Sequence, residues 1–143
     1  MQAEIKLGTR FDWVASDSYR VYPQPVESPN HTTPLPPADG RTLVSNPATV
    51  PGSTASPFGW HDTNGIPGAE FTIMRGNNAH AYDDADANGL PPAVQPDCGV
   101  NLACDFPINL SGAPSTYRPA AVANLFYWNN LIHDIQNLYG FTP

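Results

Sequence analysis

The residues that could do chemistry in this chain lie mainly in one acidic loop. Asp84-Ala-Asp86-Ala-Asn88-Gly89 matches the first half of a calcium-binding loop, in which alternate oxygen side chains converge on a hard cation and the glycine allows a sharp turn. Gln95 stands where such a loop places its bidentate glutamate. Two interpretations are open: calcium held by Asp84, Asp86 and Asn88, or an acidic turn whose side chains cap their own backbone.

The histidines are the second set of candidate ligands. No histidine is followed by glutamate and no two are spaced four residues apart, so the chain contains no HExxH zinc motif. His61 and His133 each precede an aspartate, a pair more typical of a hydrogen-bonded core or surface histidine than of a ligand. On its residues alone, the chain contains no complete active site.

The two cysteines are Cys98 and Cys104, with five residues between them. A disulfide closes easily across such a loop, whereas two cysteines cannot complete a structural zinc site. Two free buried thiols are the alternative. No basic residue lies nearby to lower a thiol pKa, so a catalytic thiolate is not expected.

One long helix is expected near the end of the chain, over about 118–139. Pro119 suits the first helical turn and Gly140 suits a position just beyond the end. Apolar residues recur at steps of three and four on one face, and further apolar residues lie on its flanks. A helix that is apolar on several sides needs burial on several sides, so we expect more protein after Pro143.

The remaining elements are expected to be short strands and long loops, which gives an α+β fold. The strand candidates are 11–22, 41–45, 69–75 and 105–110, and Asn64-Gly65 marks a tight turn. The 17 prolines and 11 glycines exclude a helical bundle, because proline breaks helix interiors.

The charge and the ends of the chain exclude some classes of partner. The net charge of −7 leaves no basic patch for nucleic acid, and no apolar run is long enough to span a bilayer. The start has no basic segment followed by an apolar one, so a leader is either lacking or already removed.

Three segments together resemble one family. They are FDWVASDSYRVYPQPVESP, SPFGWHDTNGIPGAEFTIMRGNNAHAYDDADANG and STYRPAAVANLFYWNNLIHDIQNLYGF, and the RGNN element and the IHD stretch are the specific parts. Together they resemble the amino-terminal part of mature fungalysin-type metallopeptidases, which are secreted zinc endopeptidases of the thermolysin-like superfamily. The resemblance covers most of residues 11–141.

This resemblance implies a β-rich amino-terminal lobe over 18–143, with residues 1–17 as a junction with a pro-region or the start of an expressed fragment. It also implies zinc in a cleft against a helical carboxy-terminal lobe, with an HExxH helix and a further glutamate supplied from beyond this chain. The helix would pack beneath the sheet. Asn129, Asn130 and His133 would lie where it meets later segments, with Asn129 bonded to backbone rather than to substrate.

We therefore expect the amino-terminal portion of a secreted zinc metalloendopeptidase, providing scaffold and cleft wall. The expected partners are the carboxy-terminal lobe, an inhibitory pro-region that makes the protein a zymogen, and protein or peptide substrates. The alternative is a non-enzymatic extracellular binding module stabilised by calcium, based on the acidic loop and the absent catalytic residues. A further possibility is a chain that folds poorly unless paired with its carboxy-terminal partner.

Overall fold

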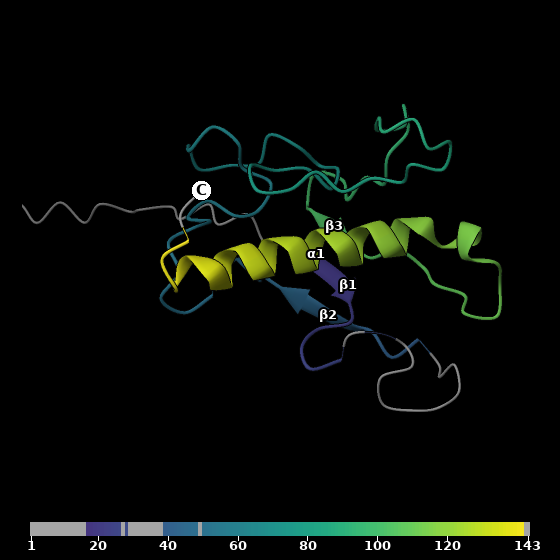
Figure 1. The fold of residues 1–143 in the computed structure, drawn as a ribbon, viewed down its shortest axis with the longest axis horizontal. Helices are drawn as coiled ribbons and strands as arrows, with labels where there is room; N and C mark the ends of the chain where they lie inside the picture. Colours follow the sequence, from purple (N-terminus) through teal and green to yellow (C-terminus); the bar gives the residue numbers. More distant parts are fainter. Residues whose placement is uncertain (1–16, 27, 29–38, 49, 142–143) are drawn as a thin grey trace, which may run out of the picture.

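The fold is known from a computed structural model, which describes residues 17–26, 28, 39–48 and 50–141. The expected strand region 11–16, the start of the chain and loop residues 29–38 lie outside these residues. Within the described ranges, three strands and two helices follow one another, which confirms an α+β arrangement (Figure 1). They are β1 (Ser18–Val21), β2 (Thr42–Ser45), β3 (Ala103–Cys104), the 3₁₀ helix η1 (Pro114–Thr116) and α1 (Arg118–Asn137).

The sheet has the order β2-β1-β3, with β1 in the centre. Strand β1 pairs antiparallel with β2, from Ser18 opposite Ser45 to Val21 opposite Thr42, and it pairs parallel with β3. Tyr19 and Val21 of β1 are both fully buried, as the alternation of side chains along a strand requires. The predicted strands around 18–22 and 41–45 are thus confirmed within these bounds.

Two other predicted strands are wrong. Over 69–75 the structure has only isolated bridges, Ile73 with Asp97 and Arg75 with His80, because the chain turns away at Gly76 before a ladder can extend. Over 105–110 no pairing occurs at all. There the N–H of Asp105 bonds the Ala103 carbonyl two residues back, and Pro107 has no N–H to donate.

The helix α1 ends at Asn137, two residues before the predicted end. Pro119 lies in the first turn, as predicted. Beyond the helix, Gly140 has a left-handed φ of 87° and the N–H of Phe141 bonds the Gln136 carbonyl at 3.2 Å. The apolar pattern runs past the true end because Leu138 and Tyr139 lie in this closing turn.

The core lies between α1 and β1. Its centre is a group of aromatic rings, in which Trp60 lies 5.5 Å from Tyr19 and 5.6 Å from Tyr127 between ring centroids. Trp60 belongs to the long segment between β2 and β3, which has no regular secondary structure and runs alongside α1 (teal to green in Figure 1). The sheet is thus smaller than a β-rich lobe would suggest, and loops supply much of the core.

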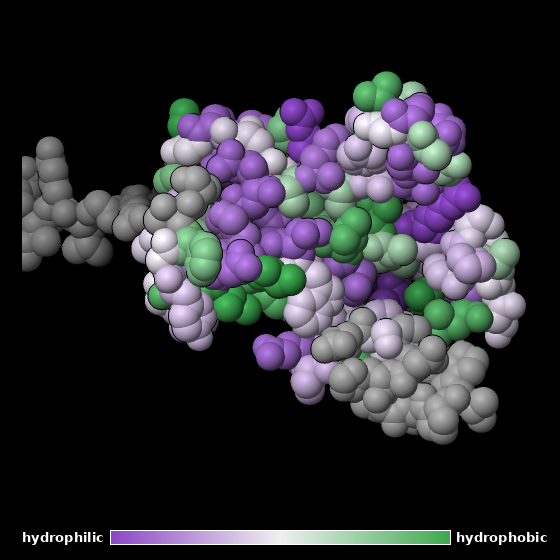
Figure 2. Space-filling view, in the orientation of Figure 1, coloured by the Kyte–Doolittle hydropathy of each residue, from purple (hydrophilic) through white to green (hydrophobic). Residues whose placement is uncertain are grey.

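The opposite face of α1 is not covered by the described residues. Leu125 is 50 % exposed and Ile132 is 46 % exposed, and Tyr139 beyond the helix end is also open to solvent. The face of the molecule shown in Figure 2 is mostly hydrophilic, with apolar residues in separate patches. Two sides of the helix therefore differ: one is fully packed and the other is not.

Candidate functional site

The fully packed side of α1 carries a buried carboxylate, Asp134. Its Oδ1 accepts hydrogen bonds from Ser56 Oγ at 2.7 Å and from His133 Nδ1 at 3.1 Å, and its Oδ2 accepts one from Trp60 Nε1 at 2.7 Å. The residue has no exposed surface. A buried carboxylate needs such donors, because leaving it without them costs several kcal/mol. Asp134 therefore acts as the polar centre that attaches α1 to the loops.

The RGNN element joins the same network. Asn78 Nδ2 donates to Ser56 Oγ at 3.1 Å, and Ser56 in turn donates to Asp134. Gly76 lies so close to the backbone of Trp60 that a Cβ at this position would stand 1.6 Å from the Trp60 carbonyl oxygen. Only glycine fits there. The two specific elements of the resemblance, RGNN and IHD, therefore meet around Ser56 and Trp60.

His133 is held by Asp134 and is partly open to solvent, with 24 % of its side chain exposed. Because a carboxylate oxygen accepts, Nδ1 of His133 is the donor in this contact. Asn130 is fully buried and donates to the Phe126 carbonyl, whereas Asn129 is exposed and donates to the Leu125 carbonyl at 2.9 Å. The expected backbone bond of Asn129 is therefore present. Of the three residues predicted to meet later segments, Asn129 and His133 are open to solvent and accessible to further protein.

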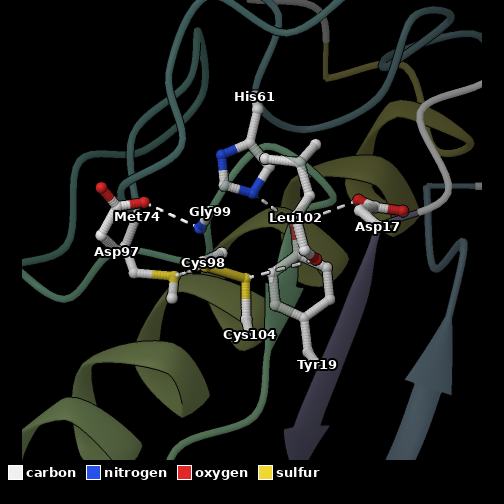
Figure 3. The surroundings of a disulfide bond; sticks show 9 residues. All are labelled: Asp17, Tyr19, His61, Met74, Asp97, Cys98, Gly99, Leu102 and Cys104. Carbon is white, nitrogen blue, oxygen red and sulfur yellow. Dashed lines mark hydrogen bonds between the residues drawn. A yellow bond between two sulfur atoms is a disulfide. The ribbon is translucent and has the colours of Figure 1, made fainter.

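A second buried polar cluster joins β1 to the loop at His61 (Figure 3). Tyr19 donates its hydroxyl to Asp17 Oδ2 at 3.0 Å and lies 2.7 Å from His61 Nε2. A hydroxyl has one proton, so with Asp17 ionised His61 Nε2 must donate to the Tyr19 oxygen. All three side chains are almost completely buried.

Burial changes the acid strengths in this cluster. Desolvation raises the pKa of Asp17 to about 6, against the opposing hydrogen bond from Tyr19. Desolvation also lowers the pKa of His61 to about 4. Burial, followed by the nearby Asp17 charge, raises the pKa of Tyr19 well above its usual value. At neutral pH the cluster therefore carries one buried negative charge.

Cys98 and Cys104 form a disulfide, so the alternative of two free thiols is wrong. Both cysteines are buried, and the N–H of Cys98 donates to the Thr72 carbonyl at 2.8 Å. The disulfide links β3 to the bridge between Ile73 and Asp97. It is a structural connection within the core.

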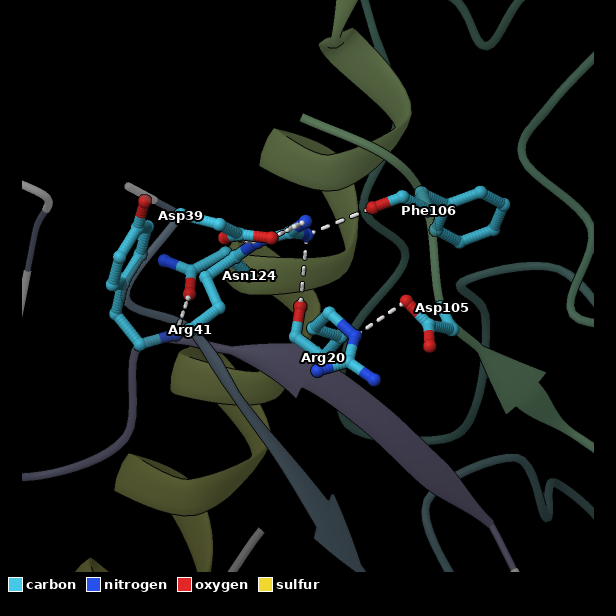
Figure 4. A network of polar contacts seen from close by, with 7 residues as sticks. Arg20, Asp39, Arg41, Asp105, Phe106 and Asn124 are labelled. Carbon is cyan, nitrogen blue, oxygen red and sulfur yellow. Dashed lines mark hydrogen bonds and ion pairs between the residues drawn. The ribbon is translucent and has the colours of Figure 1, made fainter. Parts of the chain in front are cut away.

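Arg41 is the third buried polar group, at the start of β2 (Figure 4). Its side chain is 1 % exposed. The guanidinium pairs with Asp39 and donates to the backbone carbonyls of Arg20 and Phe106 at 3.2 and 2.9 Å. Arg20 forms a separate, exposed ion pair with Asp105. These contacts hold the segment after β3 against β1 without a strand ladder.

The acidic loop forms a compact turn. Asp84 accepts the N–H groups of Asn88 at 2.9 Å and Gly89 at 3.1 Å, while Asn88 donates to Asp86 and accepts the N–H of Leu90. These are the contacts of a self-capped acidic turn. Calcium binding by Asp84, Asp86 and Asn88 stays a prediction.

A zinc site does not fit the described residues. No group of three or more His, Cys, Asp or Glu among them lies close enough to hold a metal ion. His61 contacts Tyr19, His80 contacts Gln95 and His133 contacts Asp134, each in a different part of the fold, and His31 lies outside the described residues. No catalytic step through zinc can therefore be derived from these side chains.

Surface pockets adjoin α1 among the described residues. One of about 400 Å³ is lined mainly by apolar residues, among them Ile108, Leu125 and Trp128. Another of about 550 Å³ lies beside the helix start, where Asp83 is paired with Arg118 at 3.0 Å.

Sequence reasoning missed Asp134, Asp17 and Arg41. Asp134 follows His133 and Asp17 precedes a strand, but a charged residue is usually exposed, and nothing in the local pattern marks these as buried. For Asp17 and Asp134 the available signal was the proximity in sequence of aromatic residues that must be packed. Their hydrogen-bond partners come from positions up to 78 residues away, which a local pattern does not contain.

Comparisons with known proteins agree with the observed motifs. The family model of the fungalysin metallopeptidases (M36) matches residues 18–143. The chain is 30 % identical over 131 residues to extracellular metalloproteinase 2 of Trichophyton tonsurans, covering 92 % of this chain and 19 % of that protein. It is 32 % identical over 139 residues to extracellular metalloproteinase 1 of Arthroderma gypseum, covering 96 % of this chain and 20 % of that protein.

The chain thus spans about a fifth of the length of the curated relatives that it matches. No helix among the described residues has the length and apolar character needed to cross a membrane. The match includes β1, the RGNN element, the disulfide and all of α1, which are the parts joined by the buried polar clusters. The chain belongs to the fungalysin metallopeptidase family.

Proposed function

We propose that this chain is the amino-terminal portion of a secreted zinc metalloendopeptidase that hydrolyses peptide bonds. The observation that carries the proposal is the family match over 18–143 in a chain that covers only about a fifth of its relatives. Those relatives are named extracellular metalloproteinases, which supports secretion and protein substrates.

The role proposed for this portion is structural. A catalytic zinc site needs three protein ligands and one open position, where the metal polarises the scissile carbonyl and activates water. Because the described residues offer no such group, we propose that the ligands come from protein beyond residue 143. The chain would then form the amino-terminal lobe of a thermolysin-like fold and one wall of the cleft.

The buried clusters support this role. Asp134 fixes α1 to the loops at Ser56 and Trp60, and Arg41 fixes β1 and β2 to the segment at Phe106. A helix fixed on one side by charge-assisted hydrogen bonds presents its other side, with Leu125 and Ile132, in a defined orientation. We propose that the carboxy-terminal lobe packs on that side, with an inhibitory pro-region preceding residue 18.

The test begins with the reading frame that encodes the chain and with the secreted product. We expect an HExxH segment within the next few hundred residues, and peptidase activity that 1,10-phenanthroline removes and zinc restores. Exchange of the glutamate of that motif for glutamine should abolish activity without loss of zinc. A natural secreted protein that ends at Pro143, established by mass spectrometry, would overturn the proposal.

A second experiment addresses the role of this portion alone. The amino-terminal and carboxy-terminal portions are produced separately and mixed, and peptidase activity is compared with that of each portion alone. We expect activity only from the mixture. Activity of the carboxy-terminal portion alone would contradict a required scaffold.

A further inference from the structure

Two exposed loops of this chain are built in the same way around an Asn-Gly pair. The pairs are Asn64-Gly65 and Asn88-Gly89, and the sequence has no others. All four residues are exposed, and both glycines are left-handed, with φ of 72° and 74°. Asn-Gly is the dipeptide most prone to deamidation, because glycine has no side chain to hinder its amide nitrogen as it approaches the asparagine side chain.

The reaction needs no partner other than water. The glycine nitrogen bonds to the asparagine Cγ, loses its proton, and expels the side-chain nitrogen as ammonia, which leaves a five-membered succinimide. Water then opens this ring to aspartate or isoaspartate. The step that controls the rate requires the glycine nitrogen to give up its hydrogen and to turn toward Cγ.

In both loops an aspartate side chain holds this nitrogen. The N–H of Gly65 donates to both carboxylate oxygens of Asp62, each at 3.2 Å. The N–H of Gly89 donates to Asp84 Oδ2 at 3.1 Å. A hydrogen bond to an anion stabilises the N–H form and opposes its loss of the proton.

The asparagine side chains are held as well. Asn64 Oδ1 accepts the N–H of Ile66 at 2.7 Å, and Asn88 Oδ1 accepts the N–H of Leu90 at 2.7 Å. The amide nitrogens donate to Glu70 and Asp86 respectively. Each Cγ is therefore positioned by two contacts that do not involve the attacking nitrogen.

We propose that Asn64 and Asn88 are latent deamidation sites and that Asp62 and Asp84 protect them by holding the glycine N–H. The loops are exposed, so solvent access does not limit the reaction; the carboxylate on the nitrogen does. This protection is independent of peptidase activity and does not rest on the proposed function.

The test compares the protein that contains this chain with its Asp62→Asn and Asp84→Asn variants. Each is kept at mildly alkaline pH and 37 °C with 1,10-phenanthroline to prevent self-digestion, and deamidation at each site is followed by peptide mass spectrometry and an isoaspartate assay. We expect Asp62→Asn to accelerate deamidation at Asn64 by about tenfold and to leave Asn88 unchanged, since a hydrogen bond to a charged group is worth about that factor. Asp84→Asn should do the reverse.

The matched controls are Glu70→Gln and Asp86→Asn, which loosen the asparagine amide but keep the glycine N–H bonded. We expect these variants to change the rate at Asn64 or Asn88 much less than the first pair does. Wild-type rates equal to those of the same peptides after unfolding would overturn the proposal. So would equal acceleration by Glu70→Gln and Asp62→Asn, because the side-chain contacts would then control the rate.

Discussion

A buried carboxylate is stable in a protein only when its oxygens are hydrogen-bonded, and Asp134 obtains its donors from a loop serine, a tryptophan ring and the adjacent histidine. Removal of this one side chain leaves the Trp60 N–H and the Ser56 hydroxyl without their acceptor. At the residue scale, the structure therefore depends on a small number of polar atoms within an aromatic core.

We predict that Asp134→Ala destabilises the protein that contains this chain by about 3 kcal/mol. This value combines the cost of leaving buried donors unpaired with the cost of a new cavity. The measurement is chemical denaturation followed by tryptophan fluorescence. Asp105→Ala is the control, because its ion pair with Arg20 is exposed and contributes less than about 1 kcal/mol. Equal denaturation midpoints for the two variants would contradict the role of Asp134.

The Asp17 and His61 pair gives a pH prediction. Asp17 has a folded pKa of about 6, above its usual 3.8, so its contribution to stability falls as pH rises through that interval. His61 has a folded pKa of about 4, below its usual 6.5, so its contribution rises with pH from about 4 to 6.5. The two effects oppose each other, so this cluster should make the stability of the wild-type protein depend only weakly on pH.

The variants separate the two contributions. Asp17→Asn should leave a stability that rises with pH between about 4 and 6.5, and His61→Gln should leave one that falls between about 4 and 6. Each slope is measured from denaturation midpoints across this range, relative to wild type. Slopes of the same sign in both variants would show that the assignment is wrong.

At the scale of the elements, loops supply core residues that strands usually supply. The segment between β2 and β3 supplies Trp60 and Met74 to the core, yet its chain pairings are isolated bridges. The turn at Gly76 makes this possible, because the backbone there lies directly against that of Trp60.

We predict that Gly76→Ala is severely destabilising, by about 3 kcal/mol or more, because backbone rather than a flexible side chain occupies the space of the new Cβ. Gly99→Ala is the matched control. That glycine has open space around it and a φ of 68°, so only backbone strain of about 1 kcal/mol is expected. Thermal unfolding of both variants decides the prediction, and similar melting temperatures would refute it.

The acidic loop is the second element with a test. Calcium held by Asp84, Asp86 and Asn88 should raise the melting temperature at millimolar calcium, and a chelator should reverse the change. Asp86→Ala should remove this response to calcium, because it deletes one of the three proposed ligands. The turn itself should persist, because Asp86 contacts only Asn88 among the described hydrogen bonds of the loop. An unchanged melting temperature in wild type would eliminate the site and leave a self-capped turn.

At the scale of the whole molecule, the uncovered side of α1 is the main unsatisfied feature of the described residues. Leu125 and Ile132 lie on it, seven residues apart and therefore on the same face. The relatives are about five times as long as this chain, which supports the proposal that further protein packs on this side.

We predict that Ile132→Glu lowers the melting temperature and the peptidase activity of the full protein, because a covered charge at this position would cost about 2 kcal/mol or more. Val100→Glu is the control, since Val100 is 92 % exposed on a loop. Equal melting temperatures and equal peptidase activities of the two variants would show that this side of α1 faces solvent in the full protein.

The sequence by itself determined the helix, the strand around Tyr19, the tight turns and the family. These depend on local signals: an apolar repeat of three and four, alternation in a strand, and Gly or Pro at fixed positions. The disulfide pairing was one of two open alternatives from spacing alone. The strands predicted at 69–75 and 105–110 failed because alternation records which side chains are buried, and it does not reveal whether a neighbouring strand exists to pair with.

Only the tertiary structure decided which polar residues are buried. Asp134, Asp17 and Arg41 resemble surface charges in the sequence, since their donors and acceptors come from distant segments such as Ser56 and Phe106. The end of α1 was also decided there, by a left-handed glycine that closes the last turn. The physical reason is common to these cases: burial and hydrogen bonding depend on what long-range packing places beside a residue, and a local pattern does not contain that information.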